Sequence, residues 1–316
     1  MPSTNRRQFL GAAGVALLGV AGCVGDLSNG TTDGTSASTS TSTDPSATDG
    51  TSTTTATPVS SERALGGVVV GVTMPTVRKA VAYQSIMGSG GVLVPDDQQF
   101  VVAAVESEKQ SRTDATGDPP YEGFDLVVDD ETYPAVDVED RTTGAYTTSL
   151  AGRGQVRYAA PYASGRDVGW VAFELPSPVD ASDAAIRCQH DGETAEWSLS
   201  DDQVAALSRR APTFELRSFE TTVDGPTVDL SLVVENVSET DGRFLAAVYW
   251  PTERIADDDE STIVDRSVAA GDRVEWTKTF DTKYAAGQDG TVTASVDGPV
   301  SAERTLELGT ETTTGN

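Results

Sequence analysis

Apolar and polar residues alternate along much of the chain after residue 63. The stretch 227–235 shows this most clearly, because Val228, Leu230, Leu232 and Val234 occupy every second position. Side chains on a β-strand point alternately to opposite faces, so this spacing predicts a strand with one buried face and one face in water. Similar short runs recur down the chain, separated by Gly, Pro and Asp residues that favour turns. We therefore expect an all-β protein.

Seven strands are predicted in the C-terminal part of the chain. They cover residues 214–221, 227–235, 244–250, 263–268, 274–280, 291–296 and 302–308. Their number and spacing predict an immunoglobulin-like β-sandwich, although no cysteine pair is present to bridge its sheets. The stretch Asn236-Val237-Ser238 after the second strand, with Trp250 at the end of the third, is similar to fibronectin-type adhesion modules.

The N-terminal half is also rich in strand patterns, but they are less regular. Nine strands are expected, over residues 68–73, 77–86, 99–107, 124–128, 145–150, 155–158, 170–175, 184–189 and 195–199. One helix is predicted over 200–207, where Ser200 is a capping residue and acids occupy the first turn. We place a domain boundary just after it, which gives two immunoglobulin-like β-sandwich domains over 63–208 and 212–309 and a disordered tail over 310–316.

A family resemblance covers roughly residues 65–199. The run Phe-Val-Val-Ala-Ala-Val at 100–105 precedes Phe-Asp-Leu at 124–126, then Tyr133, then Gly-Trp-Val-Ala-Phe-Glu-Leu-Pro at 169–176. This order resembles the telokin-like immunoglobulin-type domain of unknown function found in prokaryotic lipoproteins. The resemblance implies a β-sandwich and no catalytic residues.

The first 23 residues follow a different pattern. Arg6 and Arg7 precede an apolar run over 11–20, which leads to small residues and then Cys23. This is the layout of an export signal, and the run has about half of the roughly 20 residues that a membrane-spanning helix needs. We predict that residues 1–22 are cleaved, and an uncleaved transmembrane anchor is the alternative.

The leader also carries a resemblance. Asn-Arg-Arg-Gln-Phe-Leu at 5–10 resembles a twin-arginine export motif, and Val-Ala-Gly-Cys at 20–23 resembles a lipobox. The resemblance implies that Cys23 becomes the first mature residue and carries lipid on its sulfur, which anchors the exported protein to the outer face of the cell membrane. One lipid chain holds a protein only marginally, so a second chain on the same residue is expected.

Residues 23–62 are predicted to form a disordered tether. Between 31 and 61, 20 of 31 residues are Thr or Ser. A segment with so few large apolar side chains cannot bury enough surface to offset the entropy of ordering. The same composition is typical of O-glycosylated stalks.

The excess of acidic residues limits the kinds of partner that the protein can bind. The chain has 49 acidic and 22 basic residues, and its formal net charge is −27 at pH 7. This excess resembles the composition of proteins from salt-accumulating halophilic archaea, which implies that folding needs high ionic strength to screen self-repulsion. An ordinary acidic surface protein is the alternative. Either way, nucleic acid and acidic membrane surfaces are not expected as partners.

Residues suited to catalysis are scarce. The chain has one histidine, His190, which precedes a predicted Asp191-Gly192 hairpin turn, and it has neither a Gly-x-Ser-x-Gly nor a His-Glu-x-x-His motif. Cys188 shares a strand face with Ile186, so we expect a buried, unreactive thiol. We predict a protein that is not an enzyme and has no cofactor. The least supported alternative is an enzyme whose catalytic carboxylate pair is assembled from distant loops.

Acidic clusters are the best candidates for ligand binding. Asp257, Asp258, Asp259 and Glu260 follow one another, and Asp129-Asp130-Glu131 form a second run. Their oxygens could bind calcium weakly, but neither run has the spaced acidic loop of a calcium site, and solvated acidic runs are the simpler interpretation.

Two sequons are candidate glycosylation sites, and four tryptophans are candidates for an aromatic binding surface. Asn29 and Asn236 stand in Asn-x-Thr/Ser sequons, which fit N-glycosylation of an exported protein. The tryptophans, which could form an aromatic binding surface but are expected in the cores, are Trp170, Trp197, Trp250 and Trp276.

Together these features predict a membrane-anchored cell-surface lipoprotein that acts as an interaction or scaffolding module with a partner protein in the cell envelope. A small-ligand or cation binder that serves a transporter, with residues 257–260 as its site, is the alternative.

Overall fold

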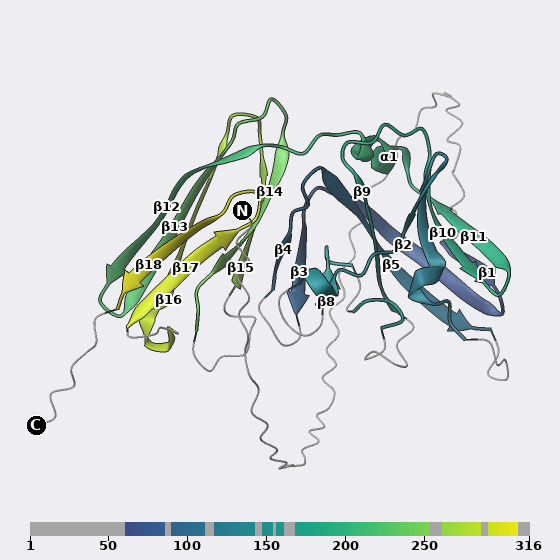
Figure 1. Cartoon of the computed structure of the whole chain (residues 1–316), viewed down its shortest axis with the longest axis horizontal. Coiled ribbons are helices and arrows are strands. Elements are labelled where there is room, and N and C mark those ends of the chain that lie inside the picture. The colour runs from purple at the N-terminus through teal and green to yellow at the C-terminus, as the bar shows by residue number, and fades with distance from the viewer. Residues whose placement is uncertain are drawn as a thin grey trace, which may run out of the picture. The chain divides into compact units, whose positions relative to one another are not determined.

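The computed structural model describes residues 61–85, 90–110, 117–142, 147–153, 156–160, 168–252, 261–285 and 290–308. The predictions for the leader, for the tether up to residue 60 and for the tail lie outside these residues. Within them the fold is all-β, as the alternating pattern predicts, and its strands are antiparallel (Figure 1).

Two four-stranded sheets form the sandwich in the first half. One has the order β1 (Glu62–Leu65), β2 (Val68–Arg78), β5 (Gln98–Lys109), β9 (Val168–Pro176), and the other has the order β11 (Glu193–Ser198), β10 (Ala184–His190), β6 (Phe124–Val128), β7 (Glu131–Pro134). A small third sheet has the order β4 (Gly91–Leu93), β3 (Val81–Ser85), β8 (Thr147–Leu150). Residues of all three sheets share one hydrophobic core.

Strand β5 is buried on both faces. Its residues from Gln99 to Val105 are all buried, which matches the unbroken apolar run 100–105. A continuous apolar run is the pattern of a strand covered on both sides, whereas alternation marks a strand with one wet face. β5 is therefore the central strand of this half, paired with β2 on one side and β9 on the other.

The second half contains the seven predicted strands. A three-stranded sheet, β12 (Phe214–Asp224), β13 (Thr227–Asn236), β16 (Arg273–Asp281), is paired with a four-stranded sheet, β15 (Ser261–Val268), β14 (Gly242–Tyr249), β17 (Thr291–Asp297), β18 (Ala302–Glu307). The two sheets enclose a common core and form a β-sandwich, as predicted.

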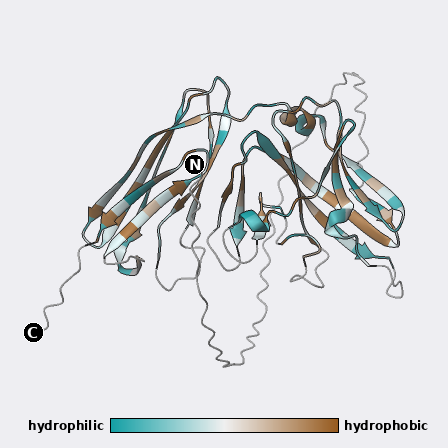
Figure 2. Cartoon of the chain, in the orientation of Figure 1, coloured by the Kyte–Doolittle hydropathy of each residue, from teal (hydrophilic) through white to brown (hydrophobic). Residues whose placement is uncertain are grey.

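A separate core fills the second sandwich. Trp250 stacks on Phe280 at 5.6 Å between ring centroids, and Phe214 meets Phe244 edge-to-face at 5.2 Å. Figure 2 shows the apolar residues as brown bands along the strands, interrupted by hydrophilic ones. The bands follow from the period of two, since alternate side chains of one strand enter the core.

The one α-helix in the described residues, α1 (Asp201–Leu207), lies where the sequence predicts it. The Ser200 side chain accepts a hydrogen bond from the Gln203 backbone, and the Gln203 side chain accepts one from the Ser200 N–H at 2.7 Å, so the helix begins with a capping box. Short 3-10 turns occur at Tyr121–Gly123, Glu139–Arg141 and Thr282–Tyr284.

Two strand predictions in the first half are wrong. The strand expected over 77–86 is broken, because β2 ends at Arg78 and the chain turns at Lys79 and Ala80 into β3 of a different sheet. The stretch 155–158 is not a strand in its described residues, and Arg157 makes an isolated bridge to Trp170. The short strands β1, β4 and β7 were not expected.

The burial pattern of β13 gives a test of the second core. Val234 is fully buried, whereas Val223 on β12 is 50% exposed. We expect Val234→Ala to lower the free energy of unfolding by about 2 kcal/mol, because two methyl groups leave a closed core. The same change at Val223 should cost less than about 1 kcal/mol. Denaturant unfolding at constant salt measures both, and equal losses would contradict the assigned core.

Candidate functional site

Several predicted site residues lie outside the described residues. These are Arg6, Arg7, Cys23, Asn29 and the acidic run Asp257, Asp258, Asp259 and Glu260. Their roles in export, lipidation, glycosylation and calcium binding therefore stay predictions. In the described part of the chain, no group of three or more His, Cys, Asp or Glu side chains is arranged to hold a metal ion.

Asn236 is enclosed in the folded chain. Its side chain is fully buried, and Nδ2 donates to the carbonyls of Thr240 at 2.9 Å, Ala269 at 3.2 Å and Val268 at 3.3 Å. Its Oδ1 accepts from the backbone N–H of Ser238 at 3.1 Å and from the Ser238 hydroxyl. The nitrogen that would carry a sugar is thus surrounded by carbonyls, which goes against the predicted glycosylation of folded Asn236 and gives this side chain a structural role.

Cys188 lies on β10 as expected, whereas His190, predicted as a turn residue, is still part of this strand. His190 ends the strand, and Asp191 and Gly192 both have positive φ, 48° and 81°, as a two-residue hairpin turn requires. The His190 Nε2 lies 2.9 Å from the Gly117 carbonyl oxygen. Burial, and secondly the charge of Asp125, raise the pKa of the Cys188 thiol to about 12, so the thiolate does not form near neutral pH.

The acidic run at 129–131 is used within the fold. The Asp129 carboxylate accepts hydrogen bonds from the Ser182 hydroxyl at 2.7 Å and from the backbone N–H groups of Ser182 and Asp183 at 3.1 Å. The Ser182 bonds are the main cause of a lowered pKa at Asp129. Glu131 accepts a hydrogen bond from the Tyr133 hydroxyl. These carboxylates bind neighbouring loops and side chains rather than converging on one point.

The tryptophans belong to the cores. Trp170, Trp197 and Trp250 are buried, and Trp276 is partly buried against the second core. They do not form an exposed aromatic surface.

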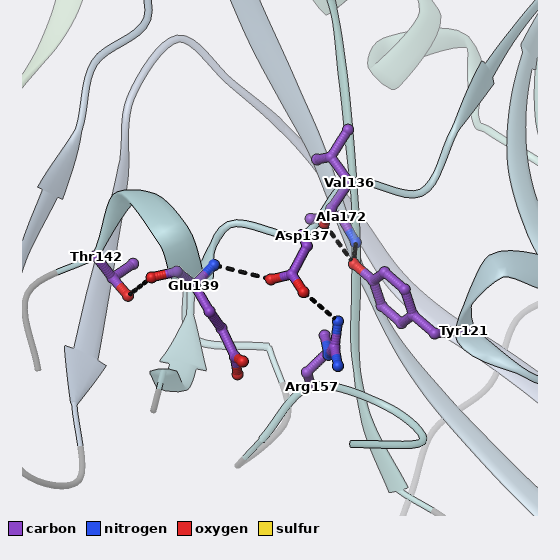
Figure 3. A network of polar contacts seen from close by, with 7 residues as sticks. All are labelled: Tyr121, Val136, Asp137, Glu139, Thr142, Arg157 and Ala172. Carbon is purple, nitrogen blue, oxygen red and sulfur yellow. Dashed lines mark hydrogen bonds and ion pairs between the residues drawn. The ribbon is translucent and has the colours of Figure 1, made fainter. Parts of the chain in front are cut away.

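A polar network surrounds Tyr121 in the first sandwich (Figure 3). The buried Tyr121 hydroxyl donates to the Val136 carbonyl at 2.8 Å and accepts from the Ala172 N–H at 3.3 Å, and burial raises its pKa. Arg157 lies over the Tyr121 ring at 4.9 Å and pairs with Asp137 at 2.7 Å. Because the Arg157 guanidinium faces both a carboxylate and an aromatic ring, its charge is used within the fold, although its buried Nε has no hydrogen-bond partner.

Basic side chains without such compensation line a cavity of about 330 Å³. It lies where β2 ends, where α1 connects to β12 and where β14 begins. Five basic side chains line it, Arg78, Lys79, Arg209, Arg210 and Arg243. Asp241 is the acidic residue of the lining, and its carboxylate accepts a hydrogen bond from the Ala270 N–H at 3.1 Å. Basic residues thus outnumber acidic ones around the cavity, whereas the whole chain has 22 basic and 49 acidic residues.

Lys79 is held in place by neutral groups. Its Nζ donates to Gln99 Oε1 at 2.6 Å and to Ser177 Oγ at 2.9 Å. Gln99 is fully buried, and its Nε2 donates to the Pro176 and Leu207 carbonyls at 2.8 and 3.0 Å. Burial, and secondly the charge of Arg209, lower the pKa of Lys79 to about 8. The ammonium is fixed, partly desolvated and next to a like charge.

Asp265 pairs with Arg243, and its charge also acts on Arg78. Arg243 pairs with Asp265 through Nε to Oδ1 at 2.7 Å and Nη2 to Oδ2 at 2.5 Å. Burial lowers the pKa of Arg78, the charges of Arg243 and Arg153 lower it further, and Asp265 acts in the opposite direction. Asp265 compensates one of the two guanidinium charges and leaves a net positive wall.

Packing beside the cavity holds its walls together. Val92, Leu245 and Ala247 form a small buried cluster, with Ala82 and Ile263 packed against it. A Cβ on Gly242 would lie 2.4 Å from Pro212, so this glycine permits the close approach of the connection 208–213 to the start of β14. The basic residues therefore project from segments that pack directly on one another.

Sequence reasoning missed this site, although a signal was present. The chain has three places where two basic residues are adjacent: Arg6-Arg7 in the leader, Arg78-Lys79 and Arg209-Arg210. The second and third pairs both line the cavity. About 130 residues separate these two pairs in the sequence, so only the fold shows that they line the same cavity.

Comparison with known proteins gives no family: neither the protein-family models nor the curated proteins contain a match to the chain. No helix in the described part of the chain has the length and apolar character that crossing a bilayer requires.

The environment of Asn236 predicts a large effect from an isosteric change. Asn236→Asp removes the Nδ2 donor and places a carboxylate oxygen against three backbone carbonyls, so we expect the free energy of unfolding to fall by about 2–5 kcal/mol. Gln98→Glu makes the same amide-to-acid change on an exposed side chain and serves as the control. Denaturant unfolding measures both variants. Equal stability of the two would show that the Asn236 contacts contribute nothing specific.

Proposed function

We propose that the protein is an exported, lipid-anchored and non-enzymatic binding module of the cell surface. The order of features along the chain supports this function: a twin-arginine-like leader, Cys23 in a lipobox-like stretch, a Thr/Ser-rich segment and then an all-β folded part. Sandwiches of this kind present loops at their ends on a rigid scaffold, which suits recognition of a partner protein. The fold class by itself does not specify a function.

A second candidate is the binding of a small ligand at the surface. The basic cavity favours this role, because it is concave, partly apolar and lined by five basic side chains. Its positive charge is unsuited to a cation, so the cation-binding form of this alternative depends on residues 257–260 alone.

The anchor is tested by Cys23→Ser. This change removes the sulfur that would carry lipid, so the protein should move from the membrane fraction to the soluble fraction of cells, as measured by fractionation and immunoblotting. Circular dichroism of the released chain should show the same β-rich spectrum. Full retention in the membrane fraction would rule out lipidation of Cys23 as the anchor.

The interaction role is tested with the same pair of chains. Both are used to recover proteins from solubilised cell envelope, and the bound proteins are identified by mass spectrometry. One envelope protein that is recovered reproducibly, and lost when loops of the sandwiches are altered, would support the interaction module. Recovery of nothing above background would favour the small-ligand function instead.

The net charge of −27 gives a prediction about salt. Lowering the KCl concentration lengthens the Debye length from about 3 Å at 1 M to about 10 Å at 0.1 M, so repulsion among the acidic side chains should destabilise the fold. We expect the Cys23→Ser chain to unfold as KCl is diluted, followed by circular dichroism. Dilution with sucrose-supplemented buffer is the control, since sucrose favours compact states without screening charge. Unchanged stability at low KCl would contradict a salt-adapted fold.

A further inference from the structure

We infer that the cavity between the end of β2, the α1–β12 connection and the start of β14 binds a small organic anion carrying two or more carboxylate or phosphate groups. This inference deepens the second candidate function and names its ligand class. It is independent of the lipid anchor, because the residues that line the cavity all belong to the folded part.

The first argument is uncompensated charge. In the described residues, Arg78, Lys79, Arg209 and Arg210 have no ion pair with a carboxylate, while Arg243 pairs with Asp265. Elsewhere, Arg217 and Arg273 both pair with Glu235, and Arg187 pairs with Glu196. Among the described residues, then, four of the five basic side chains that line the cavity have no carboxylate partner. An anion in the cavity would supply the missing negative charge.

The second argument is the hydrogen-bonding capacity that faces the cavity. Arg209 and Arg210 are exposed, and a guanidinium presents donors in a planar fork that matches two oxygens of a carboxylate or phosphate. Lys79 has three N–H donors, of which two are directed to Gln99 and Ser177. Forked donors beside a fixed ammonium suit a ligand with more than one anionic group.

The third argument is size and lining. A volume of about 330 Å³ is at the lower end of the roughly 300–1,000 Å³ range of small-molecule sites. Val77, Ala80, Pro212 and Leu245 add apolar surface to the walls. A ligand with a short carbon skeleton between its anionic groups fits this mixture better than a bare inorganic ion.

Isothermal titration calorimetry tests the inference on the Cys23→Ser chain at a fixed KCl concentration that keeps it folded. Citrate is the main probe, and glycerol 3-phosphate and inorganic phosphate are the others. We expect citrate to bind once per chain and more tightly than inorganic phosphate. The double variant Arg209→Gln/Arg210→Gln should weaken citrate binding at least tenfold. Absence of binding by all three probes would overturn the inference.

A matched variant separates a specific site from general attraction. Arg217→Gln/Arg273→Gln removes the same two positive charges from exposed residues that pair with Glu235, so citrate affinity should stay within about twofold of the parent. Circular dichroism confirms that both double variants are folded. Equal loss of affinity in the two variants would also overturn the inference, because it would show an effect of net charge alone.

A second readout follows Lys79 itself. The chain has four lysines, Lys79, Lys109, Lys278 and Lys283, so the carbon next to each amine can be resolved by NMR in lysine-labelled protein. Citrate at the site should move the Lys79 titration midpoint upward from about 8, since a nearby anion favours the charged amine against the effects of burial and of the Arg209 charge. The other charged groups that line the cavity are Arg78, Arg210, Arg243 and Asp241. An unmoved midpoint at saturating citrate would place the bound anion elsewhere. These measurements do not involve the membrane, so their failure is distinct from failure of the anchor or of partner recovery.

Discussion

Burial of every second side chain between paired sheets is the interaction on which the rest of the structure depends. β13 shows it plainly, because Val228, Leu230, Leu232 and Val234 are fully buried while the residues between them are partly exposed. This arrangement lets a chain with net charge −27 keep its acidic groups in water while the apolar face is sealed. The loops and the cavity are positioned by these sheets, and they keep their geometry only while the two cores are intact.

The extent to which the sequence predicts the fold depends on the length and periodicity of each strand. In the second half the alternation is regular and every strand lies close to its predicted position. In the first half, Val77, Val81 and Tyr83 keep the same alternation across the turn at Lys79. The pattern therefore does not indicate that the chain passes there from the sheet of β2 to the sheet of β3. The strands β1, β4 and β7 have three or four residues, too few for a period of two to be distinguished from chance.

The candidate site was harder to predict than the fold, for a physical reason. Residues such as Asn236 and Asp129 look like surface ligands in the sequence, but the fold directs their side chains into backbone hydrogen bonds. The basic cavity is the reverse case. Arg78-Lys79 and Arg209-Arg210 do not look like ligand-binding residues in the sequence, but the fold brings them together around one cavity. The charge of Arg157 is compensated by Asp137 and by the Tyr121 ring, although its buried Nε has no hydrogen-bond partner. This contrast shows that the number of cations matters less than whether the fold supplies each charge with an opposite charge.

If the protein is held by its N-terminal end, as proposed above, the first strand has a mechanical consequence. Residue 61 leads directly into β1, an edge strand joined to β2 by four residue pairs. A pulling force that enters at residue 61 would act first on the Ser61 carbonyl, which accepts hydrogen bonds from Trp197 Nε1 at 2.5 Å and from the Val72 N–H at 3.2 Å. It would then open the β1–β2 hairpin from its free end, one pair after another. β1 has four such pairs against nine in each of the β2–β5 and β5–β9 pairings, so it would separate from the sheet before those strands do.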